Sequence, residues 1–231
     1  MFGWTFESSG PEYGGYITAS KDGRPVAGLM ANDPQWNSPP DGWTTYFHTT
    51  DVKATLDRAL AAGAVTRGSV EPMEVKDKGV MGLMADPTGG AFFGLWQPTG
   101  HRGFELVNEH GAPVYFQLST RGYTAAQDFY CTVFGWQLET VSDTDEFRYS
   151  TALFGGEALL GLMDGTRDLP EGGVPSNWFF FLGADDVDKS VQQILDHGGS
   201  VIRDAEDTPL WAAGRGRRPD GGAAFNLSSL Q

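Results

Sequence analysis

Cysteine is almost absent from this chain, since Cys131 is the only one among 231 residues. A single thiol cannot form an intramolecular disulfide, which is typical of a protein that works in a reducing compartment. No apolar run reaches the roughly 18 residues that a membrane-spanning helix needs, and no charged-then-apolar leader opens the sequence. We therefore expect a cytoplasmic protein with no membrane partner.

Basic residues are also scarce. The chain has 16 Lys and Arg against 30 Asp and Glu, which gives a formal net charge of −14. Such a field repels phosphate backbones, so nucleic acid is not an expected partner. Apolar residues make up 40% of the chain and aromatic residues 13%, which is enough for a packed core. The 32 glycines and 13 prolines fit short strands joined by tight turns.

The chain repeats itself. The stretch from Asn177 to Gly199 reads as an apolar strand, an aspartate N-cap, an amphipathic helix and a glycine stop, and Gly42 to Gly63 reads the same way. Matched positions lie 135 residues apart, namely Trp43 and Trp178, Asp51-Val52 and Asp186-Val187, and Gly63 and Gly198. A repeat of this length indicates duplicated structural modules.

Further landmarks extend the repeat over the whole chain. They are Phe2-Gly3-Trp4 and Phe134-Gly135-Trp136, Gly28-Leu29-Met30 and Gly161-Leu162-Met163, and Pro87 to Phe93 and Pro219 to Phe225. Their offsets are 132, 133 and 132 residues. Each half therefore contains two modules, each composed of a strand, a helix and about three strands, which predicts an α+β fold.

The first module is incomplete in this sequence. The strand and helix expected over Ala112 to Val133 have no counterpart before Phe2. Either the start codon has been assigned too late, which we favour, or the protein has lost these elements and exposes a sheet edge. We expect a first domain over residues 1–99 that lacks its first strand and helix, a linker over 100–111, and a second domain over 112–231.

The order of these motifs resembles that of the vicinal oxygen chelate superfamily, which includes glyoxalase I, bleomycin-resistance proteins and extradiol dioxygenases. The resemblance rests on the tandem βαβββ plan and on two motifs, Phe129-Tyr130 with Phe134-Gly135-Trp136, and Asp86-Pro87-Thr88-Gly89 with Gly94-Leu95-Trp96-Gln97. Leu106 to Glu109 between the halves is similar to the two-domain, glyoxalase-like subgroup. The resemblance implies sheets that curl around concave pockets, with the helices outside.

Metal-dependent members of this superfamily place His, Gln or Glu at set strand positions, where a divalent ion acts as a Lewis acid. Counted from the landmarks, the second half has Tyr115, Gly161, Phe179, and Asn226 or Phe225 at these positions. The first half has Gly28, Thr44, and Gly94 or Phe93. These are not the usual ligands, so we expect no metal and no other cofactor. Gln117 or Glu157 would come nearer to a ligand position if the count is off by one or two residues.

The expected function is the binding of a small organic molecule in a concave, metal-free pocket. Strand alternation predicts that one pocket is lined by Tyr115, Gln117, Phe179, Phe181 and Asn226, and the other by Thr44, Tyr46, His48 and Trp96. The alternative is an enzyme of the glyoxalase lyase, isomerase or hydroxylase/dioxygenase kind, with a divalent metal or with His48 as an acid–base group. His48 could equally be a strand-end residue bonded to a loop, and the aromatic residues an ordinary filled core. Four modules in one chain are compatible with a monomer or a homodimer.

Overall fold

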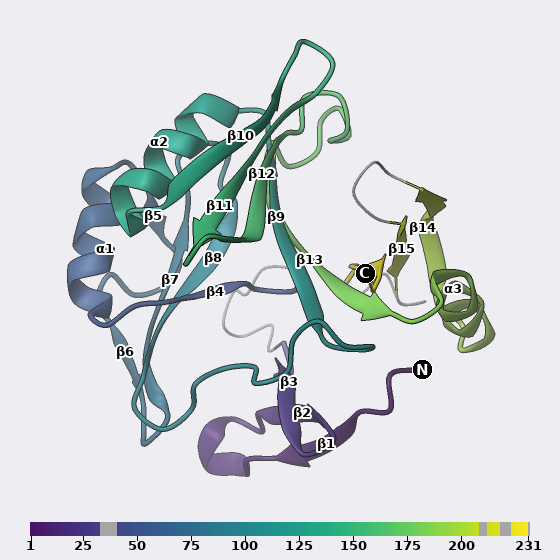
Figure 1. Ribbon diagram of the computed structural model, residues 1–231. Coiled ribbons are helices and arrows are strands. Elements are labelled where there is room, and N and C mark those ends of the chain that lie inside the picture. The colour runs from purple at the N-terminus through teal and green to yellow at the C-terminus, as the bar shows by residue number, and fades with distance from the viewer. Residues whose placement is uncertain (33–40, 208–211, 218–222, 231) are drawn as a thin grey trace. The chain divides into compact units, whose positions relative to one another are not determined.

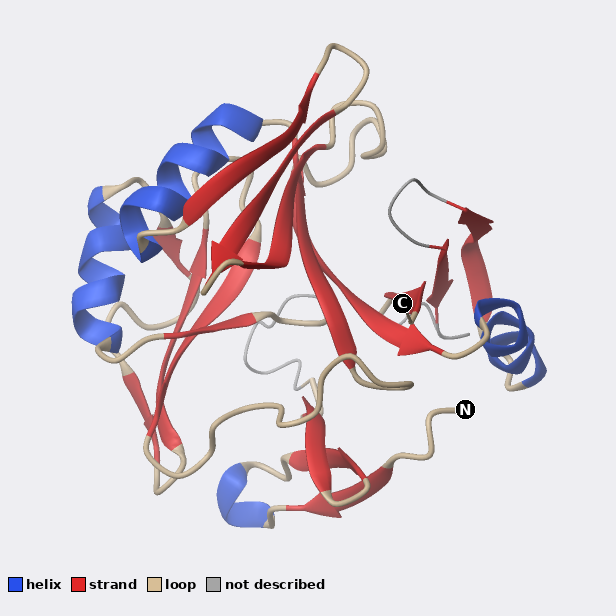
Figure 2. Cartoon of the chain, viewed as in Figure 1, coloured by secondary structure: helices blue, strands red, loops and turns tan. Residues whose placement is uncertain are grey.

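The computed structural model describes residues 1–32, 41–207, 212–217 and 223–230, and strands predominate over helices in it (Figures 1 and 2). The fold is α+β, as the sequence predicts. Its elements follow the four modules of the repeat in order, and each module ends in a group of strands.

The first two modules hold the following elements. The first contains β1 (Thr5–Ser8), the short 3-10 helix η1 (Pro11–Tyr13), β2 (Ile17–Lys21) and β3 (Arg24–Leu29). The second contains β4 (Tyr46–His48), α1 (Val52–Ala61), β5 (Val65–Thr66), β6 (Met73–Val75), β7 (Gly79–Ala85) and β8 (Phe92–Pro98).

The last two modules follow the same plan. The third contains β9 (Pro113–Thr120), α2 (Tyr123–Phe134), β10 (Gln137–Asp143), β11 (Arg148–Phe154) and β12 (Glu157–Asp164). The fourth contains β13 (Ser176–Ala184), α3 (Val187–Asp196), β14 (Ser200–Asp207), β15 (Ala212–Arg217) and β16 (Phe225–Ser229).

Sheet topology repeats from module to module. In the second, third and fourth modules the first strand pairs in parallel with the last, as β4 with β8, β9 with β12 and β13 with β16. The third and fourth modules share an eight-stranded sheet of order β10-β11-β12-β9-β13-β16-β15-β14. The first module forms a separate antiparallel sheet of order β1-β2-β3. The described part of this module therefore consists of the equivalents of β10, β11 and β12.

The helix starts confirm the caps predicted from the sequence. The Asp51 side chain accepts a hydrogen bond from the Ala54 N–H at 2.9 Å, and Asp186 accepts one from Lys189 at 2.8 Å. Each carboxylate satisfies a backbone donor that the first turn leaves unpaired. Helix α2 ends at Gly135, whose φ of 70° is the left-handed conformation that glycine adopts readily.

Strand β4 is shorter than the sequence predicts. The apolar run from Gly42 to His48 suggests a long strand, but only Tyr46–His48 is assigned to it. Trp43 lies outside the ladder, and its ring centroid is 4.7 Å from that of Phe180. Thr44 also precedes the strand. Its expected place in the β4 ladder is therefore wrong, because tertiary packing of Trp43 replaces strand pairing at this point.

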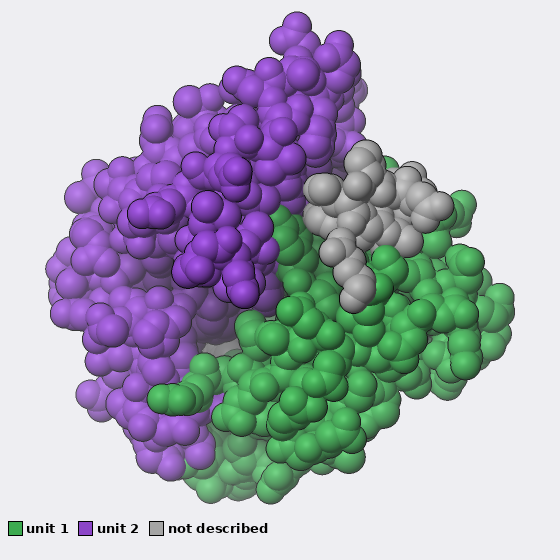
Figure 3. Space-filling model, in the orientation of Figure 1, with its two compact units in different colours: residues 1–43, 102–115, 180–231 green, residues 44–101, 116–179 purple. Residues whose placement is uncertain are grey.

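Two compact units divide the described chain, and Figure 3 colours them separately. Unit 1 comprises residues 1–43, 102–115 and 180–231, and unit 2 comprises residues 44–101 and 116–179. Each unit thus draws on both sequence halves, and β9 and β13 each contribute residues to both units. The domains of 1–99 and 112–231 stay a prediction about the duplication. Among the described residues, no helix has both the length and the apolar character needed to cross a bilayer.

Each unit has its own core. In unit 2, α1 and α2 cover one side of the strands, and buried side chains include Leu56, Phe93, Leu118 and Tyr130. In unit 1, α3 packs on the fourth module through Val187 and Ile194. The residues that bridge the two sequence halves belong to unit 1, where Leu106 packs with Val26 of β3.

Candidate functional site

Tyr130, Trp136 and Asp86, which belong to the two motifs that carry the resemblance, are buried on the helix side of unit 2. Tyr130 is fully buried, and its ring stacks on Trp136 with centroids 5.0 Å apart. Its hydroxyl accepts a hydrogen bond from Trp178 Nε1 at 2.8 Å and donates one to Asp86 Oδ2 at 3.0 Å. These motif residues hold the fold together and are not exposed to a ligand.

Asp86 completes this buried network. Its carboxylate also accepts hydrogen bonds from Thr88 Oγ1 at 2.9 Å and from the Thr88 and Ala91 N–H groups. Burial raises the pKa of the Asp86 carboxyl, and the hydrogen bonds from Thr88, Tyr130 and Ala91 lower it by less. The Asp86-Pro87-Thr88-Gly89 turn is thereby tied to α2.

The opposite side of the third module carries a polar group of side chains, which we call the Gln117 cluster. Gln117 Nε2 donates to Ser119 Oγ at 3.1 Å and to Met163 Sδ at 3.6 Å. Tyr149 Oη donates to Gln117 Oε1 at 3.5 Å. Strand pairing adds Thr151, which stands opposite Gly161, and Gly161 stands beside Gln117. Gln117, Ser119, Tyr149 and Thr151 are all buried.

The glycine beside Gln117 affects which ligand groups this face can bind. Because Gly161 has no side chain, the row Thr151–Gly161–Gln117 presents one amide and one hydroxyl separated by bare backbone. An amide offers two donors and two acceptor lone pairs. The cluster can therefore form hydrogen bonds to uncharged carbonyl and hydroxyl groups.

The fourth-module candidates lie on β13 and β16, in unit 1 apart from Phe179. Phe181 stands beside Asn226 in the parallel pair, and both are buried. The Tyr115 and Phe181 rings are 6.4 Å apart, and Asn226 Nδ2 donates to the Phe180 carbonyl at 3.0 Å. Phe179 and Phe181 share a strand face because they are two residues apart on β13. Tyr115 and Gln117 share a face of β9 for the same reason.

The second-module candidates have a different environment. Tyr46 is 43% exposed and His48 is exposed, whereas Trp96 is half-buried. Tyr46 stands beside Gly94, and His48 beside Trp96. Phe47 and Leu95, between them in sequence, face the core. Tyr46, His48 and Trp96 therefore share the side of the sheet that faces away from the helices.

The residues that pair across the sheet lie two positions further along the first strand of each module than the ligand positions counted from the sequence landmarks. Gln117 rather than Tyr115 stands beside Gly161, Phe181 rather than Phe179 beside Asn226, and Tyr46 rather than Thr44 beside Gly94. The offset is two residues each time, so the counted residues on β9 and β13 keep the same strand face. Counting from helix landmarks gives the face correctly but cannot give the hydrogen-bonded partner.

These paired positions offer too few ligands for a metal ion. They hold the Gln117 amide beside Gly161, the Phe181 ring beside the Asn226 amide, and the Tyr46 phenol beside Gly94. Gln117 is the one side chain among them of the kinds that metal-dependent members use, and a divalent ion needs several such groups from different strands. Over the described ranges, no three His, Cys, Asp or Glu side chains converge in a way that could hold one.

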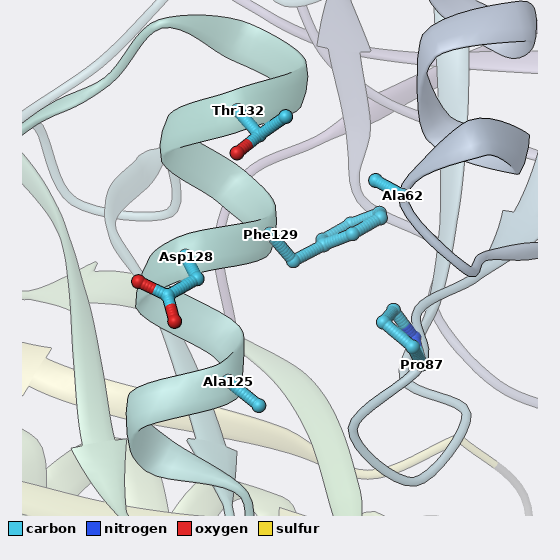
Figure 4. Close-up of a pocket in the computed structure, with 6 residues that line it drawn as sticks. All are labelled: Ala62, Pro87, Ala125, Asp128, Phe129 and Thr132. Carbon is cyan, nitrogen blue, oxygen red and sulfur yellow. The ribbon is translucent and has the colours of Figure 1, made fainter.

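A surface cavity of about 360 Å³ lies on the helix side of unit 2 (Figure 4). Phe129 of α2 points toward Ala62 and Pro87, and Asp128, Ala125 and Thr132 complete the lining. None of the residues predicted to bind a ligand lines this cavity. It is therefore distinct from the faces described above.

Comparison with known proteins identifies the family. The family described as "Glyoxalase/Bleomycin resistance protein/Dioxygenase superfamily" matches residues 112–221. CFP32 of Mycobacterium tuberculosis, provisionally named a glyoxylase, is 31% identical over 215 residues, which cover 90% of this chain and 78% of that protein. The chain belongs to the glyoxalase/bleomycin resistance protein/dioxygenase superfamily. The resemblance inferred from the sequence is thus confirmed.

Other members of the superfamily are also similar to this chain. The anthracycline biosynthesis protein DnrV of Streptomyces peucetius is 32% identical over 253 residues, covering 100% of this chain and 86% of DnrV. The 2,3-dioxygenase LapB of Pseudomonas sp. KL28 aligns with a TM-score of 0.62 at 14% identity, covering 99% of this chain and 84% of LapB. The Mn(II)-bound glyoxalase of Novosphingobium aromaticivorans gives 0.61 at 13% identity, covering 100% and 75%. These two structural matches show a shared fold.

Sequence reasoning missed part of the Gln117 cluster. Tyr149, Thr151, Ser119 and Met163 are in contact with Gln117 or stand in the same rows, yet they were not among the predicted residues. Alternation along Arg148–Phe154 marks Tyr149 and Thr151 as sharing one face. It does not say that β11 lies two strands from β9, which only the sheet order provides.

Proposed function

We propose that this protein binds a small organic molecule without a resident metal ion. The observation that carries the proposal is the set of side chains at the paired first-strand and last-strand positions, which are Gln117 with Gly161 and Phe181 with Asn226. Amides and rings at these positions favour hydrogen bonding and stacking over metal chelation. No Lewis-acid step is assigned to the protein.

The proposed binding residues form a separate face in each unit, Gln117 and Phe179 in unit 2, and Tyr115, Phe181 and Asn226 in unit 1. Gln117 would bind carbonyl or hydroxyl groups, held in orientation by Ser119 and Tyr149. The Tyr115 and Phe181 rings would contact a planar ligand, and the Asn226 amide would add polar contacts. One relative is named for anthracycline biosynthesis. Anthracyclines are planar, oxygen-rich molecules, which supports a ligand of this general chemistry.

Metal content is the first test. The protein is purified without chelators and without a His tag, and its metals are measured by mass spectrometry. Substoichiometric traces would support the proposal. One or two equivalents of nickel, zinc, manganese or iron would overturn it and would lead to lyase and dioxygenase assays.

Ligand binding is the second test. Daunomycinone, an uncharged anthracycline aglycone, is titrated into the protein and followed by fluorescence. Saturable binding that weakens in Gln117→Leu would support the proposed face. Phe6→Ala serves as the control because Phe6 is an exposed ring on β1. Flat titrations at high protein concentration, for daunomycinone and for a metabolite panel, would overturn the proposal.

A further inference from the structure

The cavity on the helix side of unit 2 contains none of the residues assigned to the proposed function (Figure 4). Ala125, Asp128, Phe129 and Thr132 recur at helical spacing, so they share one face of α2. Ala62, at the C-terminal end of α1, lies across from them. The two alanines leave more room between the helices than longer side chains would.

Part of the cavity lining is apolar and fixed in place. Phe129 is 3% exposed, and its ring centroid is 4.9 Å from that of Tyr130 and 6.3 Å from that of Phe93. Pro87 follows Asp86 in the turn that the hydrogen bond from Tyr130 ties to α2. A surface that is fixed before a ligand arrives reduces the entropy that binding would otherwise cost.

Asp128 gives the cavity a negative charge. It is the only charged residue of α2, and its exposed carboxylate has no hydrogen bond or ion pair within the described part of the chain. Burial raises the pKa of the nearby Cys131 thiol, and the charge of Asp128 raises it further. Thr132, one turn after Asp128, adds a hydroxyl oxygen that can accept a hydrogen bond.

The end of α1 adds to the negative potential. Ala62 is the C-cap of this helix, and the last carbonyl groups of a helix carry a partial negative charge. Arg58, the basic residue in the last turn, does not line the cavity. Its guanidinium donates to the Val133 carbonyl at 3.2 Å and to the Thr55 hydroxyl at 2.9 Å. None of the six lining residues is basic, so the cavity favours a cation over an anion of the same shape.

We propose that this cavity is a binding site for a primary alkylammonium ion, separate from the face that contains Gln117. The alkyl chain contacts Phe129 and Pro87, and the ammonium group donates hydrogen bonds to the Asp128 carboxylate and the Thr132 hydroxyl. An ammonium group has three donors and no acceptor, which matches these two oxygen groups. The site goes beyond the proposed function and does not depend on it.

The test compares three probes with similar alkyl chains, namely hexylammonium, hexanol and hexanoate. Each is titrated into the full chain near neutral pH and followed by two-dimensional amide NMR spectra. We expect saturable shifts with hexylammonium at the amides of Ala62, Ala125 and Thr132. Hexanol should bind about three- to fivefold more weakly, because it lacks the charge of a partly exposed ion pair. Hexanoate should not saturate.

Two substitutions separate the charge of the cavity from its shape. Asp128→Asn keeps the size of the side chain but removes its charge, so it should weaken hexylammonium binding by about three- to fivefold and leave hexanol binding unchanged. Ala125→Met fills the cavity with an apolar chain, so it should abolish saturable binding of both probes. High salt should weaken the binding of hexylammonium but not that of hexanol.

Matched control variants lie outside the cavity. Asp188→Asn removes the charge of an exposed aspartate on α3, and Ala61→Met enlarges an exposed alanine of α1 that does not line the cavity. Both variants, and Gln117→Leu, should bind hexylammonium as the wild type does. Urea unfolding of each variant confirms that the protein still folds.

Three results would overturn the alkylammonium site. The first is a lack of saturation with hexylammonium at tens of millimolar. The second is wild-type binding in both Asp128→Asn and Ala125→Met. The third is a set of saturating shifts at Gln117 and Ser119 in place of α2, which would support the proposed function while removing this site.

Discussion

The second and third modules are built alike on the helix side and differently on the other. Phe47 and Phe93 of the second module pack with Tyr130 and Phe134 of the third in one core. Away from the helices, the second module carries the exposed side chains of Tyr46 and His48, whereas the third carries the buried, polar Gln117 cluster. Packing constrains the core side of a duplicated module, so the opposite faces can differ in burial and polarity.

The largest expected effect concerns the shared core side. Asp86→Ala removes the acceptor for Tyr130 and for two backbone N–H groups. Because these buried donors lose their partners, we expect the free energy of unfolding to fall by about 2–4 kcal/mol. Urea unfolding measures it. The control is Asp143→Ala, an exposed aspartate paired with Arg148, which should cost less than about 1 kcal/mol. Equal losses would contradict a special role for the Asp86 network.

A substitution in the Gln117 cluster of the third module should lower the free energy of unfolding less than a substitution in the core. Gln117→Leu removes the amide oxygen that accepts a hydrogen bond from the Tyr149 hydroxyl and the amide nitrogen that donates to Ser119. We expect a loss of about 1–2 kcal/mol in unfolding free energy, together with weaker binding of daunomycinone. The comparison with the second module is sharpened by Tyr46→Ala, which should lower the unfolding free energy less because Tyr46 is 43% exposed. A larger loss for Tyr46→Ala would contradict the difference in burial between the two faces.

The pH dependence of stability should reveal the buried Asp86. Burial raises its pKa in the folded protein, so the folded state binds this proton more tightly than the unfolded state does. The stability that this carboxyl contributes is therefore present below its unfolded pKa of about 4 and is lost as pH rises through the raised folded value. Asp86→Asn should remove that component. Urea unfolding of both proteins between pH 4 and 7 measures the difference, and parallel curves would contradict it.

The smallest effect is expected for His48. Its side chain is exposed at the end of β4, so His48→Ala should change the free energy of unfolding by less than about 0.5 kcal/mol. The same variant tests the alternative that the protein is an enzyme with His48 as its acid–base group. If an activity is detected, an unchanged kcat and pH profile in His48→Ala would remove His48 from that mechanism. A large loss of kcat with normal stability would favour the enzyme.

Much of the fold could be predicted from local patterns in the sequence. The caps at Asp51 and Asp186, the helix over Tyr123–Phe134 and the order of the modules follow from short-range patterns that each segment satisfies by itself. The start of β4 at Tyr46 did not follow, because Trp43 packs on Phe180, which is far away in sequence. The roles of Asp86, Tyr130 and Trp178 as one hydrogen-bonded chain were also out of reach, although all three belong to recognisable motifs.

For the candidate site residues, too, the sequence predicts local features but not contacts between distant strands. Alternation gave the shared strand faces of Tyr115 with Gln117 and of Tyr46 with His48, because a strand has a period of two. It could not give the partner across the sheet, which is Gln117 for Gly161, Phe181 for Asn226 and Tyr46 for Gly94. It also could not show that the Tyr46 and Trp96 rings occupy the space where side chains at Gly94 and Gly79 would stand.

The sequence by itself determined the duplication, the α+β class, the helix caps and the family of this protein. These features depend on residue periodicity and on motifs whose spacing is local. Only the tertiary structure decided that Asp86, Tyr130 and Trp178 form a buried hydrogen-bonded network. It also decided that Tyr149 of β11 contacts Gln117 of β9. The physical reason is that strand pairing and side-chain packing join residues that no sequence period connects.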